Sequence, residues 1–586
     1  MLALFVSAVS GQETVRDKAK GRANAEEIAQ RKAQAVDILK GVVEGAAEIQ
    51  QTQTRVTVLT GALDLLWKHD EAYARANFVK TATALSDRFA SDTTPRTERS
   101  EIRASIGNLL AAFARHDPQA AERLLEKFQK VVEDVLKGNL SPSERLSLAQ
   151  ASLDSDVTQS VALAAKVLEA GVPGSFPSYL NELEQRDAAA TASLFRVALS
   201  ILAGGRVYTP MHVTVLSTYV FREPQMSVPT VRGGHDGLPL EFGTFASPLS
   251  PPSRDLDRAL VAAYLTASSA YLNNEAIGLE QRPDPDAIHV AACFFLVKKL
   301  RGYADRLNLE GTQNWPLLDA KYTYLAERAK LSDGTLSGLA TVAQRIVAEN
   351  TVFRFDAGEN AFANAEKTKD PTERADLLAT GIRQQIDEGK YSEAVQKIAD
   401  LQDDNFRDQL NSYLTFRMAE ASLKKLDWDS FNSQVNRVSD IRLRTYLILS
   451  AAHAASDAGK KKISAEFLLT ALASLSKIEN ADARAAALVT ATGLIYATAD
   501  ASWGAQVLSE GVSAINRANQ YDGGLYGVSL EVRKSKVWLT VPKSDLSHCF
   551  EQAAKHDWQG ALAAAHSIEA KALRSQAYIA ACRNLL

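Results

Sequence analysis

The sequence predicts an all-α protein, an α-solenoid of stacked antiparallel helical hairpins with one long Pro/Gly-rich loop insertion. Three observations lead to this prediction. Apolar residues recur at helical spacing along most of the chain, a short phrase repeats every 36 or 37 residues in the C-terminal half, and prolines concentrate in one segment. Helix is therefore expected to dominate, with strand confined to a short piece near Val213–Phe221 or absent.

An apolar run from Leu2 to Val9 opens the chain. Ala8 and Ser10 fit the −3 and −1 positions of a signal-peptide cleavage site, although no basic residues precede the run. Residues 1–10 are therefore expected to be the remnant of a signal peptide, with a mature protein that begins near Gly11 and is exported, periplasmic or secreted. A packed helix end in a cytoplasmic protein is the alternative.

Residues 12–203 have the pattern of an N-terminal helical array. Their first part is charged and rich in Ala and Gln, and it carries an amphipathic apolar stripe. Asp117-Pro118 supplies a capping residue followed by proline at the first helical position, where its missing N–H costs nothing. Asp70, Asp117 and Asp187 each begin a loose copy of the repeated phrase.

The helical periodicity of apolar residues is lost in residues 204–254, which contain seven of the 17 prolines of the chain. Long loops of this kind in compact proteins are usually functional or disordered. Val213–Phe221 is compatible with a short helix or a strand because of its β-branched residues. The polar and aromatic side chains of the segment form a candidate binding loop: Tyr219, Arg222, Arg232, His235 and Asp236. A solvated excursion packed over the array is the competing interpretation.

Central helices are expected in residues 255–349, a connector in 350–370, and a regular helical repeat array in 371–586. The repeated phrase of this array is a polar capping residue, a small or apolar residue four positions later and an apolar residue eight positions later. Offsets of four and eight lie on one face of a helix. The copies start at Lys390, Asp427, Ser464, Asp500 and Asp557.

Arginines recur in the same array, near the start of Ala-rich helices. They are Arg407, Arg444, Arg484 and Arg574. We expect them to donate hydrogen bonds to neighbouring loops or carboxylates between repeats. Alanines allow neighbouring helices to approach closely, and ordering them costs little side-chain entropy.

Gly389-Lys390-Tyr391 followed by Ala394 resembles the turn and second helix of a tetratricopeptide repeat. Leu426-Asp427-Trp428 followed by Phe431 is a poorer copy, with a bulky residue at the normally small position. The period is longer than the 34 residues of that family, and the first-helix Trp, Leu-Gly and Tyr pattern is absent. The resemblance covers residues 371–586, implies a tetratricopeptide-like α-solenoid and transfers no binding residue.

Charge and cysteine content narrow the class of protein. The net charge of −4 argues against a nucleic-acid partner, and no apolar stretch reaches the roughly 18 residues of a membrane span.

Cys293, Cys549 and Cys582 are too few and too scattered for a disulfide framework. His289 and Cys293 share a helix face at a spacing of four, but a core position is favoured because no second ligand pair matches.

No phosphate-binding loop, His-Glu-x-x-His or Gly-x-Ser-x-Gly motif is present, so no catalytic residue, metal or cofactor is expected. The sequence favours a non-enzymatic, exported scaffold that binds another protein along a curved helical surface. A cell-envelope enzyme or carbohydrate-binding protein, with its site between the array and the 204–254 loop, is the second hypothesis. A structural subunit of a larger assembly is the third.

Overall fold

The computed structural model describes residues 26–136, 142–204, 208–221, 230–231, 240–241, 257–309, 314–349, 362, 365–366, 368, 371–401, 403–498, 501–532, 535–543 and 545–586. Helices make up almost all of this part of the chain, which confirms the all-α class. The chain divides into two compact units. Unit 1 comprises Met1–Asn77 with Asp356–Leu586, and unit 2 comprises Phe78–Phe355.

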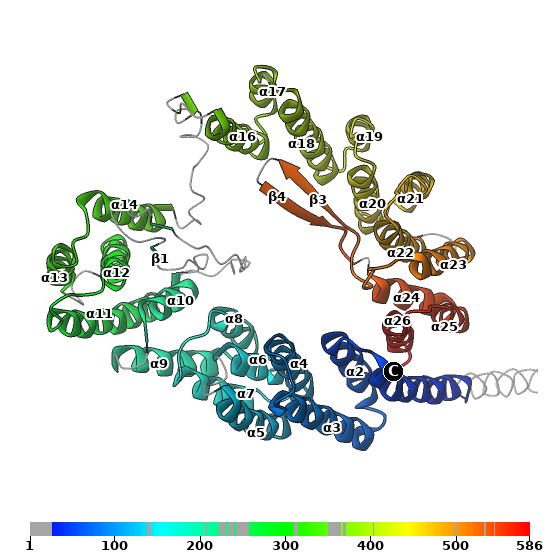
Figure 1. Ribbon diagram of the computed structural model, residues 1–586, viewed down its shortest axis with the longest axis horizontal. Helices are drawn as coiled ribbons and strands as arrows, with labels where there is room; N and C mark the ends of the chain where they lie inside the picture. Colours follow the sequence, from blue (N-terminus) through cyan, green and yellow to red (C-terminus); the bar gives the residue numbers. More distant parts are fainter. Residues whose placement is uncertain are drawn as a thin grey trace, which may run out of the picture. The chain divides into compact units, whose positions relative to one another are not determined.

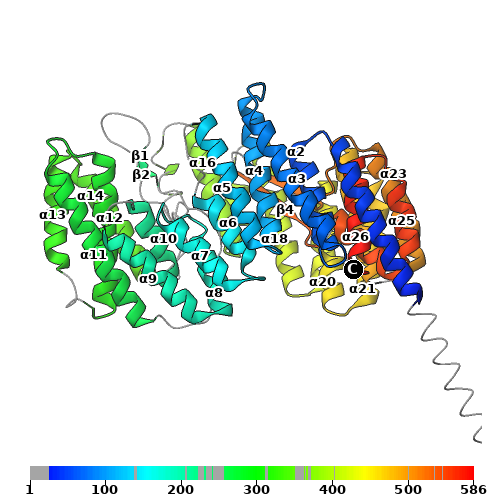
Figure 2. The same ribbon diagram turned by 90° about the horizontal axis from the view of Figure 1, so that it is seen from below.

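Unit 2 is built from two layers of helices (Figures 1 and 2). One layer consists of α4 (Arg96–Ala114), α6 (Pro142–Ser152), α8 (Phe176–Arg186), α10 (Pro210–Phe221), α12 (Ala287–Arg306) and α14 (Asp333–Glu349), each in contact with the next. The other consists of α5 (Pro118–Leu136), α7 (Val157–Leu168), α9 (Ala188–Gly204), α11 (Arg258–Glu280) and α13 (Trp315–Arg328), which also contact in order. Helix α3 (Glu71–Ala90) crosses the boundary between the units.

Unit 1 repeats this plan with the C-terminal helices. Its first layer holds α16 (Pro371–Asp387), α18 (Asp404–Lys424), α20 (Ile441–Asp457), α22 (Ala481–Thr498), α24 (Leu546–His556) and α26 (Lys571–Arg583). A second helix packs back on each of the first five: α17 (Tyr391–Ala399), α19 (Trp428–Val435), α21 (Lys461–Leu475), α23 (Ala501–Arg517) and α25 (Trp558–His566). Successive hairpins therefore bury their apolar faces against one another.

The N-terminal segment packs against α26, at the C-terminal end of the described helices. A helix of residues 26–45 is followed by η1 (Ala46–Glu48) and α2 (Thr52–Leu66), and α2 contacts α26. The Cys582 thiol points at the carbonyl of Ala35 (3.9 Å), and Lys571 pairs with Glu48 (2.6 Å). The predicted array of residues 12–203 is therefore divided, because its first helices belong to unit 1.

The repeated phrase marks buried contacts, as its spacing predicts. Every residue that the sequence places at the fourth position is buried: Ala74, Ala121, Thr191, Ala394, Phe431, Leu468, Gly504 and Ala561. Gly504 is glycine for a local reason, since a Cβ there would lie 2.7 Å from the Tyr496 ring. The start at Ser464 is wrong by one turn. Helix α21 is capped at Lys460, so Ser464 and Leu468 take the fourth and eighth positions.

Two of the recurring arginines, Arg444 and Arg574, bind loop carbonyls as predicted, whereas Arg407 pairs with a carboxylate of its own helix. Arg444 donates to the carbonyl of Val438 (2.8 Å), Arg574 donates to that of Ile568 (3.3 Å), and Arg407 pairs with Asp404. In the N-terminal segment, Arg55 donates to the carbonyl of Ile49 (3.4 Å), also six residues earlier. This shared contact relates the N-terminal segment to the C-terminal repeats.

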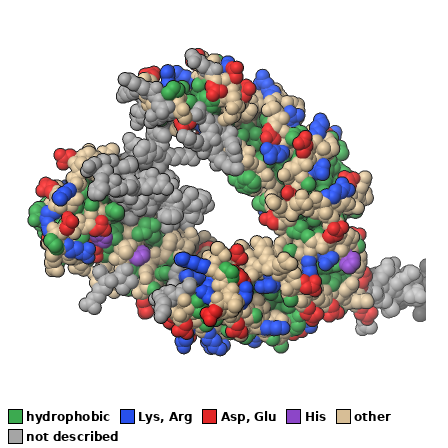
Figure 3. Space-filling model, in the orientation of Figure 1, with side chains coloured by type: hydrophobic (Ala, Val, Ile, Leu, Met, Phe, Trp, Pro, Cys, Tyr) green, Lys and Arg blue, Asp and Glu red, His purple; other side chains and the backbone are tan. Residues whose placement is uncertain are grey.

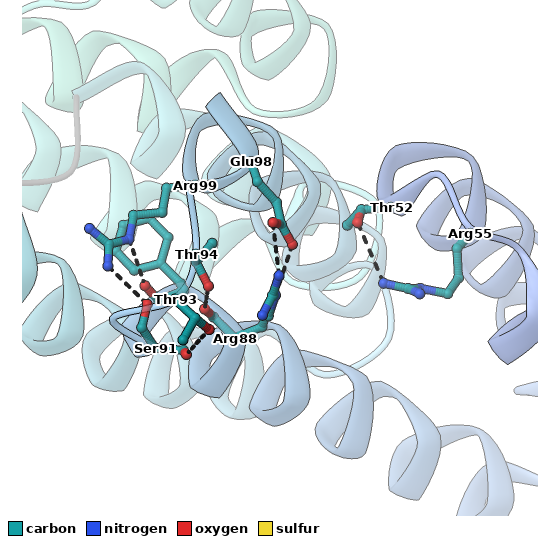
Figure 4. A network of polar contacts seen from close by, with 9 residues as sticks. Thr52, Arg55, Arg88, Ser91, Thr93, Thr94, Glu98 and Arg99 are labelled. Carbon is teal, nitrogen blue, oxygen red and sulfur yellow. Dashed lines mark hydrogen bonds and ion pairs between the residues drawn. The ribbon is translucent and has the colours of Figure 1, made fainter. Parts of the chain in front are cut away.

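Unit 2 uses the same device at the turn between α3 and α4 (Figure 4). Arg99 donates to the carbonyls of Phe89 (3.1 Å) and Ser91 (2.9 Å). Arg88 adds a two-pronged contact to Glu98 (2.8 and 2.9 Å), so one turn is held by two guanidinium groups. Such charged donors compensate carbonyls that the helix end leaves without a partner.

Strand does occur, but not where it was expected. Val213–Phe221 lies in α10 and all its residues are buried; packing on every side outweighs its β-branched composition. The strands are β1 (Thr230–Val231) paired with β2 (Leu240–Glu241), and β3 (Gly527–Val532) paired with β4 (Ser535–Thr540). The expected 204–254 loop therefore begins with a helix, and part of its remainder forms a β pair.

We predict that Ala394→Asp destabilises unit 1 by about 2 to 5 kcal/mol, because the carboxylate would be buried without a partner between packed helices. Ala394 is fully buried in α17, whereas the adjacent Val395 is half exposed. Val395→Asp is therefore the matched control and should change stability by less than about 0.5 kcal/mol. Chemical denaturation measures both, and equal losses would contradict the assignment of the buried face.

We also predict that Ala35→Glu loosens α26, although the two lie at opposite ends of the sequence. Ala35 is fully buried against α26, and its neighbour Gln34 is exposed. Hydrogen exchange of the α26 amides should accelerate about tenfold or more in Ala35→Glu, because a buried charge raises the open population of this contact. Gln34→Glu should leave these rates unchanged. Unchanged α26 exchange in Ala35→Glu would show that the N-terminal helix does not stabilise α26.

Candidate functional site

The candidate binding loop is only partly within the described residues. Tyr219 lies in α10 with its ring against Phe195 (5.3 Å between centroids), and its hydroxyl donates to Glu184 (3.3 Å). It is 6% exposed, so it links α10 to α8 and α9 within unit 2. Arg222, Arg232, His235 and Asp236 lie outside the described residues. Their proposed binding role stays a prediction.

Of the His289–Cys293 pair, Cys293 is part of the core of unit 2, whereas His289 is only partly buried. His289 contacts Glu275 through its Nε2 atom (2.7 Å), while Cys293 is fully buried and burial raises the pKa of its thiol. Within the described ranges no group of three His, Cys, Asp or Glu side chains could hold a metal ion. The two residues therefore have separate surroundings and do not converge on one ligand.

The C-terminal histidines and aromatic residues connect helices. His556 contacts the carbonyl of Tyr496 (2.9 Å), and His566 contacts the hydroxyl of Tyr578 (3.0 Å). Trp428 packs against Phe467 of the next hairpin (5.7 Å between centroids), as expected for an aromatic wedge between repeats. These contacts favour a structural role for both sets.

A β-hairpin interrupts the helical order between α23 and α24, and it is the feature of unit 1 that the repeats do not require. Its strands pair antiparallel from Gly527 opposite Thr540 to Val532 opposite Ser535. Strand β3 contacts α18 and α20, so the hairpin lies across the first layer of unit 1 (Figure 1). The hairpin thereby adds a surface that side chains of the helices alone do not form.

Buried contacts fix the base of this hairpin. Tyr526 is fully buried, and its hydroxyl donates to the carbonyl of Arg442 at the start of α20 (3.0 Å). Burial also raises the pKa of Tyr526, so its hydroxyl keeps its proton at neutral pH. Upstream, Asp482 accepts hydrogen bonds from the backbone N–H groups of Asn519 and Gln520 (both 2.8 Å). The hairpin is therefore tied to helices on either side of its base.

The two faces of the hairpin differ in exposure. Val528 and Leu530 of β3 are buried, whereas Trp538 of β4 is 65% exposed. Among the residues that the structure describes, Trp538 is the most exposed large apolar side chain. Its indole lies over Gly527, where a Cβ would come within 2.9 Å of the ring. Glycine at that position therefore leaves room for the indole on the outer face.

Two shallow pockets lie elsewhere on the units. One of about 460 Å³ in unit 2 lies between α4 and α6, where Arg103 pairs with Glu144 (2.6 Å). The other, of about 300 Å³ in unit 1, lies between α23 and α25 and is lined mainly by small side chains such as Ala561 and Ala564. Neither brings together side chains that suggest a reaction. The hairpin is the stronger candidate site.

Sequence analysis missed this site, although a signal was present. Residues 527–532 alternate apolar and polar side chains, and two residues separate them from a second segment, 535–540, whose Val537, Trp538 and Leu539 favour strand. No protein-family model, curated protein or solved structure matches the chain. None of the helices in the described part of the chain is long and apolar enough to cross a membrane.

We predict that Tyr526→Phe loosens the hairpin while leaving the fold intact. The change removes the hydroxyl that donates to the partly buried carbonyl of Arg442. Loss of this hydrogen bond should lower the free energy of opening the hairpin by about 1 to 2 kcal/mol. Hydrogen exchange of the β3 and β4 amides should therefore become about five- to thirtyfold faster. Tyr324→Phe, at a tyrosine that is 55% exposed, is the control and should have no effect. Equal protection in wild type and Tyr526→Phe would show that other contacts hold the hairpin.

Proposed function

We propose that the protein is a non-enzymatic helical-repeat scaffold of α-solenoid type, and that it binds another protein through the β3–β4 hairpin of unit 1. The observation that carries this proposal is the exposure of Trp538 on an element with a rigid base. An exposed tryptophan leaves a large apolar area in water, and tryptophan is among the residues that most often dominate binding energy at protein interfaces.

The anchoring of the hairpin supports this function. Because Tyr526 and Asp482 fix its base to the helices, Trp538 is presented from a pre-organised element. Pre-organisation favours affinity, since less conformational freedom is lost when a partner binds. Stacked helical hairpins add extended surface on either side of such an element.

The charge distribution favours a protein over a polyanion as the partner. Lysine and arginine side chains are interspersed with aspartate and glutamate on the face seen in Figure 3. The net charge of the chain is −4, whereas a nucleic-acid binder usually has a basic surface. The exported location expected from Leu2–Val9 remains a separate prediction, because these residues lie outside the described part.

We predict that Trp538→Ser weakens partner binding about thirtyfold, as expected for loss of an interface residue that contributes roughly 2 kcal/mol. Immobilised wild type and variants are incubated with extract of the cells that make the protein, and retained proteins are quantified by mass spectrometry. Leu469→Ser, at a leucine of α21 that is 59% exposed, is the matched control.

A protein retained by wild type and Leu469→Ser but depleted with Trp538→Ser supports the proposal. An identical set for all three proteins would contradict it. A partner that co-purifies at a fixed ratio and does not exchange would instead identify a permanent subunit of an assembly, and would replace the scaffold function.

A further inference from the structure

Strand β4 has one edge that no other strand covers in the described part of the chain. The sheet contains β3 and β4 alone, and β3 is the strand that contacts α18 and α20. Strand β4 therefore has β3 on one side and an open edge on the other. An open strand edge presents backbone N–H and C=O groups that can pair with an added strand.

The register identifies which residues present these groups. The backbone N–H of Val541 donates to the carbonyl of Tyr526 (3.1 Å), so these two residues form a hydrogen-bonded pair. Hydrogen-bonded and non-hydrogen-bonded pairs alternate along an antiparallel ladder. The pairs Gly527–Thr540 and Ser529–Trp538 are therefore of the second kind. The N–H and C=O groups of Trp538 and Thr540 consequently point away from β3, toward the open edge.

We propose that β4 binds an extended, acidic segment of a partner protein, which pairs with its open edge as a third strand. This inference rests on the proposed protein-binding function and specifies the partner's form. In strand addition of this kind, backbone hydrogen bonds provide affinity and contacts to alternate side chains provide specificity. Trp538 occupies the position at which an apolar side chain of the added strand would meet the indole face.

The charge of the sequence around the hairpin selects an acidic partner. Arg533, Lys534 and Lys536 fall within four consecutive residues, and Glu531 is the nearby acidic residue. An acidic strand would be attracted to this segment, whereas like charges placed opposite each other destabilise a strand pair. The same sequence disfavours a second copy of β4 as the occupant, because residues 531–536 of each copy carry a net charge of +2 and would repel each other.

The experiment uses the full chain and two fluorescein-labelled, eight-residue peptides that alternate valine with either glutamate or lysine. Fluorescence anisotropy measures binding. We expect the glutamate peptide to bind and the lysine peptide to bind at least about tenfold more weakly. A glutamate peptide N-methylated on alternate amides, which keeps side chains and charge but removes strand donors, should also lose at least about fivefold in affinity. This arm leaves the protein unchanged, so it does not depend on the folding of a variant.

A protein variant tests the same edge. Thr540→Pro removes an N–H that points outward and spares the ladder to β3, and proline is tolerated at such edge positions. It should weaken glutamate-peptide binding at least about fivefold, whereas Thr540→Ala keeps the N–H and should bind within about twofold of wild type. Circular dichroism and exchange of the β3 amides verify that the hairpin is retained in both.

Three results would overturn the inference. They are equal binding of the methylated peptide, equal binding of the lysine peptide, and a wild-type dimer that Thr540→Pro dissociates. If Thr540→Pro binds the glutamate peptide as wild type does, while Trp538→Ser still loses its partner from extract, the protein-binding function stands and strand addition is wrong. If Trp538→Ser also has no effect, the proposed function itself fails.

Discussion

The packing of each helical hairpin on the next is the interaction on which the structure depends. A single hairpin cannot bury its apolar face alone, so every repeat needs a neighbour on both sides. The fourth residue of each phrase is buried at these contacts, and its size is adapted to its surroundings, as Gly504 is to the Tyr496 ring. Helix α26 packs against the N-terminal segment, including Ala35 and α2, so residues far apart in the sequence also contribute to this packing.

The β3–β4 hairpin is the exception to this regular packing of helical hairpins in unit 1. The helices around it bury their apolar faces against one another. Arginines such as Arg444 donate hydrogen bonds to backbone carbonyls of the turns. In the hairpin, Val528 and Leu530 are buried on the strand that contacts α18 and α20. Trp538, on the other strand, is exposed to solvent. One face of this insertion is fixed to two helices, and the other exposes a tryptophan among polar residues such as Ser529 and Thr540. This arrangement supports the proposal that the hairpin binds another molecule.

Sequence reasoning recovered the helical class because helical periodicity and capping residues are local signals. Asp427 and Asp557 cap α19 and α25 as predicted, and the phrase identifies the buried face. It left helix or strand open at Val213–Phe221 because of the β-branched residues there, and the structure shows helix α10, buried on all sides. The joining of the two chain ends could not be predicted, since periodicity gives no information on contacts between residues more than 500 positions apart.

The alternation of residues 527–532 was a local signal for strand β3 that was overlooked, whereas no local signal indicated the exposure of Trp538. Trp428 and Trp538 are indistinguishable by residue type, yet one packs against the next repeat while the other faces solvent. Of the five candidate loop residues, Tyr219 is buried beneath neighbouring helices, because the helical pattern continues to Phe221. Sequence composition can show where a segment departs from the repeat. Which side chain of that segment is exposed to solvent depends on tertiary packing, which composition does not reveal.

The pairing of the N-terminal helix with α26 also fixes an order of events during synthesis. The contact between Ala35 and Cys582 spans 547 positions, so it cannot form until the ribosome has made Cys582. Unit 2 lies within Phe78–Phe355 and has all its own residues much earlier. Throughout that interval the Lys571–Glu48 ion pair and the contact of α2 with α26 are absent as well. Unit 1 is thus completed after unit 2, and a chain that stops short of α26 would lack these contacts of its N-terminal segment.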